Sequence, residues 1–384
     1  MKFDINIIKN WINPELGNAD IVNLFTLMGF ESYLEKNIVD ISIPYNRNNC
    51  TNLFGICGNN VNYQKINKYN LFFKKNKSVI NVIMNNKAFS PLYYGSTIIG
   101  INNNILLPEY ISDTLINNKF KLINPIIDII NYVTLITGQP MHAYDYDYLH
   151  GDIIIKKTNN CFTSLLLNDE YINVLPNTYI ISDKKKLIAL PGVMGSCSTK
   201  VTPATKNVFL ESAFFDSRVI SSISKKYDII TNSSILFENG ININYTKFSL
   251  NYATYLIKKL LGASCITFIE KCYKKYIKKD SCIRISQSYL RNIIGYNLNN
   301  SKLSEVLNKL KFSFKKLSGA WYVNIPVYRK DIESKINIAS EIIKMYGYDN
   351  IFSIPLKKHF KHKVARYSNY KINSDISYFL THNG

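Results

Sequence analysis

The alternation of apolar and polar side chains predicts a chain that mixes strands with helices. Residues 38–43 place Val39, Ile41 and Ile43 on one side and Asp40 and Ser42 on the other. This period of two is typical of a half-buried strand.

Residues 3–28 predict two short helices upstream of that strand. In the second helix Asn18 is the expected N-cap, and Gly29 is expected to end it. Downstream, a turn over residues 44–50 is followed by a predicted helix that runs to about Gln64.

The segment from about 88 to 270 mixes short strands with helices. One helix is expected to begin with Pro108 in its first turn, and another to run from an N-cap at Ser217 to about Tyr227. A helical apolar stripe is expected to end at Gly262. The β-rich runs are 153–155, 179–181 and 208–210.

Residues 282–350 predict two helices, a β-hairpin and a third helix, an order similar to a small winged-helix module. Ser286 and Ser301 are the expected N-caps of the first two helices, and the hairpin is expected to turn at 318–319. The apolar stripe of the third helix consists of Ile336, Ala339, Ile343 and Tyr346.

These elements predict an α+β, multi-domain fold, in which a central mixed α/β domain is flanked by a small N-terminal domain and a winged-helix-like domain. The predicted domains are residues 1–80, 85–272, 280–352 and 353–384.

Composition narrows the choice of partners and compartment. The 384 residues include 47 Lys+Arg and 27 Asp+Glu, a net charge of +20, which favours nucleic acid or another acidic partner. The excess of Asn, Lys, Ile and Tyr indicates a coding bias that weakens this inference.

No apolar run reaches the roughly 18 residues of a membrane span, and the N-terminus lacks a signal-peptide core. Seven cysteines without a C-x-x-C pair predict reduced thiols in a cytoplasmic protein.

Three strings carry candidate chemistry. In residues 138–145, Gly-Gln-Pro-Met-His-Ala-Tyr-Asp, His142 follows a rigid turn at Pro140 and is either a structural histidine or a site residue. In residues 190–196 two glycines, including Gly192, form an ordinary tight turn or let backbone N–H groups approach a ligand. Glu211 lies inside an apolar strand, where it is a structural hydrogen-bond anchor or a recognition group.

These strings, in this order, resemble the editing domain of the β subunit of bacterial phenylalanyl-tRNA synthetase. The resemblance extends to residues 43–50 in the first domain and to residues 325–331 and 342–349 in the third. It implies that residues 85–272 are an editing-type domain and that residues 353–384 begin a catalytic-like domain. It also implies a shortened form, without the oligonucleotide-binding-fold insertion after Glu35 and without the C-terminal half.

The resemblance implies an editing pocket that hydrolyses tyrosine wrongly attached to tRNA(Phe), by ester hydrolysis in which a second site binds the hydroxyl that distinguishes Tyr from Phe. Glu211 matches the residue that recognises the phenolic oxygen, and His142 the histidine near the ester. Asn131 and Gly192 match other pocket positions, and Thr231 a polar residue of the rim.

The chain departs from the family pattern inside that pocket. Ile130 stands where a threonine is usual, Pro191 where an alanine is usual, and Ile235 and Leu236 replace His and Arg. Each lost donor can reduce a rate on the order of 10²-fold, so we expect weakened editing.

The family's Mg²⁺ ligands are two Asp and two Glu, which correspond here to Asp331, Asn337, Ser340 and Glu341. Oxygen ligands suit this hard cation, but only two carboxylates remain. The alternatives are a weakened Mg²⁺ site and an ordinary solvated helix N-terminus.

The resemblance implies the β subunit of a phenylalanine–tRNA ligase, an enzyme that uses ATP to charge tRNA(Phe) at a site on the α subunit. The expected partners are tRNA(Phe) and an α subunit, in a complex of two α and two β chains. One alternative is a non-catalytic tRNA-binding or assembly module derived from that subunit, and another is a free-standing deacylase that works without an α chain.

Overall fold

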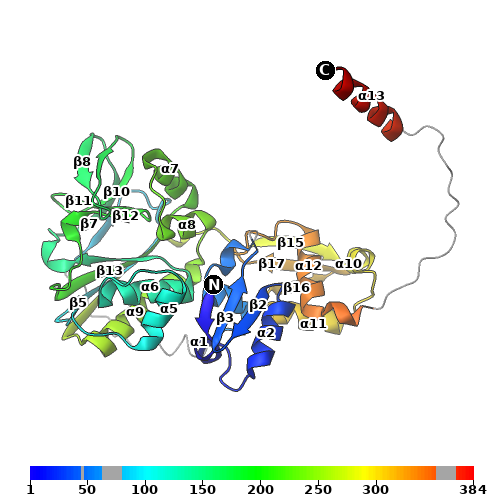
Figure 1. Ribbon diagram of the computed structural model, residues 1–384, viewed down its shortest axis with the longest axis horizontal. Helices are drawn as coiled ribbons and strands as arrows, with labels where there is room; N and C mark the ends of the chain where they lie inside the picture. The colour runs from blue at the N-terminus through cyan, green and yellow to red at the C-terminus, as the bar shows by residue number, and fades with distance from the viewer. Residues whose placement is uncertain (45–46, 63–79, 352–368) are drawn as a thin grey trace. The chain divides into compact units, whose positions relative to one another are not determined.

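Helices and strands alternate along the chain in the computed structural model (Figure 1), which describes residues 1–44, 47–62, 80–351 and 369–384. The chain divides into two units, Met1–Tyr348 and Asp349–Gly384. In the second unit the helix α13 (Asn369–Asn383) has every side chain exposed. The predicted α+β class is confirmed, with several sheets in the first unit.

The N-terminal segment forms an antiparallel sheet in the order β1-β3-β2, with two helices. Val39 and Ile41 are buried, as the alternation predicted. Gly17, and not Asn18, is the N-cap of α2, because the Asp20 carboxylate accepts the Gly17 backbone N–H at 3.2 Å. The elements are β1 (Lys2–Asp4), α1 (Ile5–Trp11), α2 (Asn18–Leu27), β2 (Glu31–Glu35) and β3 (Ile38–Ser42).

The helix predicted up to Gln64 is much shorter in the structure. It is the five-residue α3 (Leu53–Cys57), preceded by a 3₁₀ turn (Asn48–Cys50). Gly58 ends it with a φ of +53°, a conformation that side chains other than glycine rarely adopt. Gln64 itself lies outside the described residues.

Two sheets and a set of helices make up the central segment. One sheet is antiparallel in the order β14-β5-β13-β6; the other has the order β12-β11-β10-β7-β4, and only its β4–β7 pair is parallel. A separate hairpin, β8–β9, completes the strands. The strands are β4 (Val82–Met84), β5 (Leu92–Ile99), β6 (Met141–Asp145), β7 (Ile153–Lys157), β8 (Phe162–Leu165), β9 (Tyr171–Val174), β10 (Tyr179–Ser182), β11 (Leu187–Leu190), β12 (Met194–Gly195), β13 (Asn207–Phe214) and β14 (Cys265–Cys272).

The expected central helices are present, with two corrections at their starts. Pro108 is the N-cap of α5 and lies before its first turn, and Asp216, not Ser217, caps α7 by accepting the Arg218 backbone N–H. The stripe that ends at Gly262 is confirmed. The helices are α5 (Glu109–Asn117), α6 (Pro125–Thr137), α7 (Ser217–Tyr227), α8 (Asn232–Asn239) and α9 (Thr246–Leu261).

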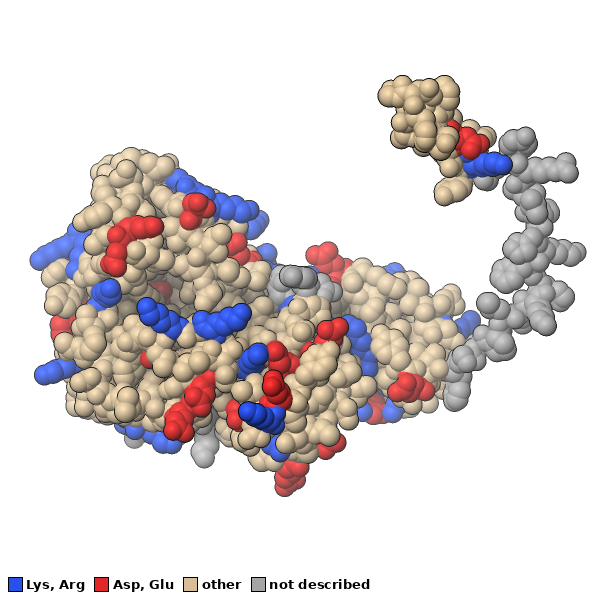
Figure 2. All heavy atoms as spheres, in the orientation of Figure 1, with Lys and Arg blue, Asp and Glu red and all other residues tan. Residues whose placement is uncertain are grey.

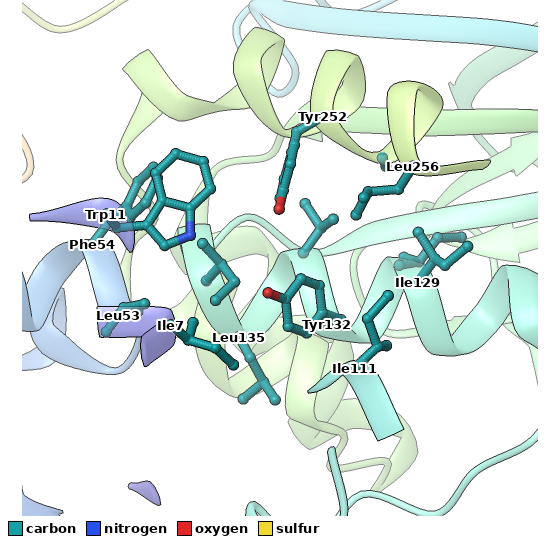
Figure 3. Close-up of a cluster of buried hydrophobic side chains, with 14 of the residues drawn as sticks. Ile7, Trp11, Leu53, Phe54, Ile111, Ile129, Tyr132, Leu135, Tyr252 and Leu256 are labelled. Atoms are coloured by element: carbon teal, nitrogen blue, oxygen red, sulfur yellow. The ribbon is translucent and has the colours of Figure 1, made fainter. Parts of the chain in front are cut away.

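Strand β13 separates two hydrophobic cores, because successive side chains point to opposite faces. Val208 and Leu210 belong to a core shared with α6 and α9, whereas Phe209 belongs to the core of the second sheet. The N-terminal segment packs into the first of these cores, where Trp11 meets the ring of Tyr252 at 5.4 Å (Figure 3). Residues 1–62 and the central segment therefore share one core.

The last part of the first unit is a three-stranded sheet, β15-β17-β16, with three helices. Ser286 caps α10 as predicted, but Asn299, not Ser301, caps α11 by accepting the Lys302 backbone N–H. Ile336 of the predicted stripe is exposed, and the buried apolar residues of α12 are Ile338, Ala339 and Ile342. The elements are β15 (Ser281–Ser286), α10 (Gln287–Ile294), α11 (Asn300–Lys309), β16 (Ser313–Leu317), β17 (Ala320–Ile325) and α12 (Lys335–Tyr346).

Within the described ranges, every helix is too short or too polar to cross a membrane.

Candidate functional site

The motif at residues 138–145 connects the end of α6 to strand β6. Gly138 ends α6 with a left-handed φ of +74°. The buried Gln139 side chain then donates to the Ala213 carbonyl at 2.9 Å and accepts from the Thr246 hydroxyl at 3.0 Å. These bonds attach the turn to β13 and α9, so the strand that carries His142 starts from a fixed position.

Strands β6 and β13 bring His142 and Glu211 together. The two residues are directly opposite in the antiparallel register, so their side chains project from the same face of the sheet. A cavity of about 50 Å³ opens there, and His142, Glu211 and Gly192 all line it. Three residues predicted from separate strings thus meet at one site.

Glu211 is buried and bonded to two tyrosines. Its Oε2 accepts hydrogen bonds from the hydroxyls of Tyr93 at 2.8 Å and Tyr144 at 3.1 Å. Burial raises the pKa of Glu211 to about 7, against the opposite effect of these two bonds. Burial, and then the charge of Glu211, raises the pKa of both tyrosines well above the usual value, so both stay protonated donors. Oε1 has no hydrogen-bond partner in the described part of the chain.

His142 is neutral at physiological pH. The side chain is half-buried, and its loss of solvent lowers its pKa to about 4. Its ring meets the ring of Tyr144 edge-on, with 4.6 Å between centroids. Among the described residues its ring nitrogens have no hydrogen-bond partner. A neutral imidazole of such low basicity orients a substrate group better than it removes a proton.

The glycines of residues 190–196 leave space for neighbouring side chains as well as allowing backbone groups to approach the site. A Cβ atom on Gly195 would lie 2.6 Å from two atoms of the His142 ring, so a larger residue would displace the imidazole. Gly192 has a φ of +65°, and a Cβ there would meet Phe237 at 2.9 Å. The sequence pattern predicted either an ordinary tight turn or backbone approach to a ligand, and it did not indicate the space that Gly195 leaves for His142.

Of the other predicted pocket residues, Asn131 lies outside the cavity and Thr231 lies at its edge. Asn131 is on α6 and is not among the residues that line the cavity; α6 packs in the core of Val208 and Leu210, on the other face of β13. Ile130 is buried in that same core. Thr231 lies at the edge of the site, where its hydroxyl donates to the carbonyl of the cavity-lining Val193 at 2.9 Å.

Tyr93 and Tyr144 are site residues that sequence analysis did not single out. A signal for Tyr144 was present, because residues two apart on a strand share a face and His142 precedes it by two. No sequence signal indicated Tyr93. It lies on β5, and only the fold places β5 beside β13, the strand that carries Glu211.

Asp331 and Glu341 also lie close together, but around an arginine. Arg329 donates from Nε to Asp331 Oδ1 at 2.9 Å and from Nη2 to Asp331 Oδ2 and Glu341 Oε2, both at 2.8 Å. Glu341 Oε1 is 3.3 Å from Lys344 Nζ and 3.9 Å from Arg47 Nη1. Burial favours the neutral acids, but these cations lower the pKa of both carboxyl groups overall.

The other two proposed ligands, Asn337 and Ser340, form hydrogen bonds with the backbone at helix α12. Asn337 Oδ1 accepts from the backbone N–H of Ser334 at 3.0 Å, at the start of α12, and the Ser340 hydroxyl donates to the Ile336 carbonyl. Across the described ranges, no cluster of three or more His, Cys, Asp or Glu is arranged to hold a metal ion. These residues as placed do not fit Mg²⁺, because Arg329 lies between the two carboxylates and Lys344 and Arg47 also lie beside Glu341.

We therefore expect millimolar Mg²⁺ to leave the melting temperature of the chain unchanged relative to EDTA at matched ionic strength. Binding to a site at 100 times its Kd would add about 2.7 kcal/mol to the free energy of unfolding, which differential scanning calorimetry detects easily. A rise of several degrees with Mg²⁺ but not with added NaCl would contradict this expectation.

Comparison with known proteins matches two segments of the chain to protein families. Residues 90–262, which contain the cavity, match the B3/4 domain family, and residues 283–348, which contain Arg329, match the tRNA synthetase B5 domain family. The chain is thus of the class that combines a B3/4 domain with a tRNA synthetase B5 domain.

The similar proteins share one name. The phenylalanine–tRNA ligase beta subunits of Blochmanniella floridana and Francisella tularensis are 32% and 30% identical over 85% and 83% of this chain. That of Coxiella burnetii is 28% identical over 89%. By sequence the chain is similar to phenylalanine–tRNA ligase beta subunits over most of its own length, and it spans 42%, 41% and 43% of the lengths of these three relatives.

Among solved structures, an N-terminal fragment of the phenylalanyl-tRNA synthetase beta-subunit from Pyrococcus horikoshii aligns with a TM-score of 0.46 and 17% identity. The alignment covers 91% of this chain and 99% of that fragment.

Proposed function

We propose that the chain acts in a phenylalanine–tRNA ligase as its β subunit, where it supports the ATP-dependent joining of phenylalanine to tRNA(Phe) on an α subunit. The observation that carries this proposal is the similarity to ligase β subunits over more than four fifths of the chain, through both matched domains. The basic net charge of +20 agrees with a tRNA partner.

The test is reconstitution with an α subunit from the same source. The two chains are expected to co-purify, and Phe-tRNA formation is expected to require both. Charging by the α subunit alone at the full rate would contradict the proposal.

We further propose that the cavity at His142 and Glu211 hydrolyses Tyr-tRNA(Phe), at a reduced rate. Glu211 Oε1 is available to accept a bond from the phenolic hydroxyl of a tyrosyl group, which a phenylalanyl group lacks. With a pKa of about 7, Glu211 is partly ionised at neutral pH and then accepts strongly. His142, uncharged, would position the ester or a water molecule.

Deacylation of Tyr-tRNA(Phe) by the αβ complex tests this proposal. We expect His142→Ala to slow release of tyrosine on the order of 10²-fold, because it removes a polar group beside the ester. Glu211→Gln keeps the shape and should lose preference for tyrosine over phenylalanine. The control is Glu109→Gln, a change to an exposed carboxylate on α5. Equal rates in the wild type and both site variants would contradict the proposal.

A non-catalytic tRNA-binding or assembly module is the second candidate. It is favoured by the two tyrosines that already bond Glu211, since a carboxylate satisfied in this way can serve as a structural anchor. If the chain is such a module, the α subunit needs it for charging, and tyrosine release does not exceed the uncatalysed rate. Tyrosine release by the chain alone would instead indicate a free-standing deacylase.

A further inference from the structure

A groove lined by lysines lies away from the cavity, between the β7–β10–β11 part of the second sheet and the β8–β9 hairpin. Its volume is about 910 Å³. Lys156 and Lys157 come from the end of β7, and the other lysines from the three-residue run 184–186 in the β10–β11 turn. In Figure 2, blue Lys and Arg spheres project from the side of the molecule where Figure 1 labels β7 and β11.

The local structure holds this run of lysines at the groove. The buried Asp183 carboxylate accepts the backbone N–H groups of Lys185 and Lys186, both at 2.7 Å, and that of His150 at 3.1 Å. Lys186 Nζ donates to the Ser198 carbonyl at 2.8 Å. Because Asp183 is committed to these backbone groups, it fixes the turn instead of pairing with a lysine side chain.

The lysine side chains of the groove are not paired with carboxylates in the described part of the protein, although the Asp183 carboxylate also lines the groove. None of its five lysines forms an ion pair, although Lys302, Lys309 and Lys344 elsewhere pair with carboxylates. Lys157 and the side chains of Lys184 and Lys185 are exposed. Five like charges close together repel one another, so the arrangement favours an anion that binds from solution.

The basic surface continues beyond this groove. Lys157 also lines a second groove of about 590 Å³, together with Lys226 and with Arg218, which pairs there with Asp216 at 3.5 Å. An extended row of cations fits an extended polyanion better than a single small phosphate. The first groove also offers hydroxyl and amide groups from Thr158, Asn160 and other residues, which suit sugar and phosphate oxygens.

The groove is distinct from the candidate editing cavity. On β10, Ile181 lines the cavity and the preceding residue, Ile180, lines the groove. Neighbouring strand residues point to opposite faces, so the two features lie on opposite faces of one sheet.

We propose that this lysine groove binds the phosphate backbone of RNA. The inference deepens the proposed function and rests on it only for the identification of the RNA as tRNA. The assignment of the groove to an RNA backbone rests on the charge and shape of the groove. Lysines act here as point charges on phosphates, so they give affinity without sequence preference.

The test measures the affinity of the full chain for a labelled tRNA(Phe) transcript by fluorescence anisotropy over a range of salt concentrations. The test variant is Lys157→Gln/Lys184→Gln/Lys185→Gln. The matched control changes three exposed lysines that line neither groove, Lys121→Gln/Lys258→Gln/Lys275→Gln. Both have the same net charge, and all six residues are exposed, so both are expected to fold.

If each groove lysine neutralises one phosphate, the slope of log K against log salt falls by about 2–3 in the groove variant, and binding at low salt weakens roughly tenfold or more. The control variant should change little. Equal affinities and slopes in the two variants would overturn the inference. Equal competition by polyglutamate of the same charge would overturn the assignment to RNA and indicate an acidic protein.

This outcome is independent of the proposed function. A groove variant that loses RNA affinity supports the inference even if reconstituted charging and tyrosine release both fail. A groove variant that binds RNA normally refutes the inference even if charging and editing both occur.

Discussion

Arg329→Met is expected to lower the free energy of unfolding by about 3–5 kcal/mol, since removing one partner of a buried ion pair leaves uncompensated charge. The Arg329 side chain is only 8% exposed and bonds both Asp331 and Glu341. Without the guanidinium, Asp331 keeps no cation within ion-pair distance in the described part of the protein, and Glu341 keeps only Lys344 and Arg47. Equilibrium unfolding in urea measures the change.

The matched control is Arg218→Met. Arg218 also pairs with an aspartate, Asp216 at 3.5 Å, but its side chain is 84% exposed. A surface pair of this kind contributes about 0–1 kcal/mol, so its loss should be small. Adding Asp331→Asn and Glu341→Gln to Arg329→Met should restore part of the stability, because the stranded charges are then absent. Equal effects of Arg329→Met and Arg218→Met would contradict the assignment of Arg329 as the internal cation of this cluster.

Glu211→Gln is expected to become steadily more stable than the wild type as the pH rises. The folded protein raises the pKa of Glu211 from 4.5 to about 7, so below pH 4.5 the acid is neutral in both states and costs nothing. As the pH rises from 4.5 to 7, the unfolded state ionises first and wild-type stability falls by about 3 kcal/mol. The uncharged amide of the variant would keep the two tyrosine bonds without this loss. Urea unfolding at a series of pH values measures the difference.

The contribution of His142 to the pH dependence of stability has the opposite sign. Its pKa is lowered in the folded protein, so it contributes a stability loss as the pH falls from 6.5 towards 4, where only the unfolded state takes up a proton. The two slopes oppose each other in the wild type, and His142→Gln should reveal the fall caused by Glu211 alone. Glu109→Gln, which alters an exposed carboxylate, is the matched control. A constant difference between Glu211→Gln and the wild type would refute the burial of this charge.

Local signals predicted much of the fold. Alternation located β3, and the capping residues Ser286 and Gly262 located helix ends. The predicted N-caps Asn18 and Ser301 were wrong, because a neighbouring residue occupies the N-cap position in each helix. Several polar side chains near a helix start can accept from the same backbone N–H groups.

The candidate site was predictable only in part. Motif spacing singled out His142, Gly192 and Glu211, which meet at one cavity. The resemblance to the synthetase family also implied Asp331 and Glu341 as metal ligands, but whether a metal ion or an arginine lies between them depends on where Arg329 points.

By itself the sequence determined the α+β class, most helices, some of the strands and the resemblance to a known family, because periodicity, caps and motif strings are local properties of the chain. Only the tertiary structure decided that Tyr93 and Tyr144 bond Glu211, that the N-terminal segment shares a core with the central one, and that lysines from β7 and the β10–β11 turn line one groove. Each of these depends on strands or helices distant in sequence coming into register, and no local pattern specifies that pairing.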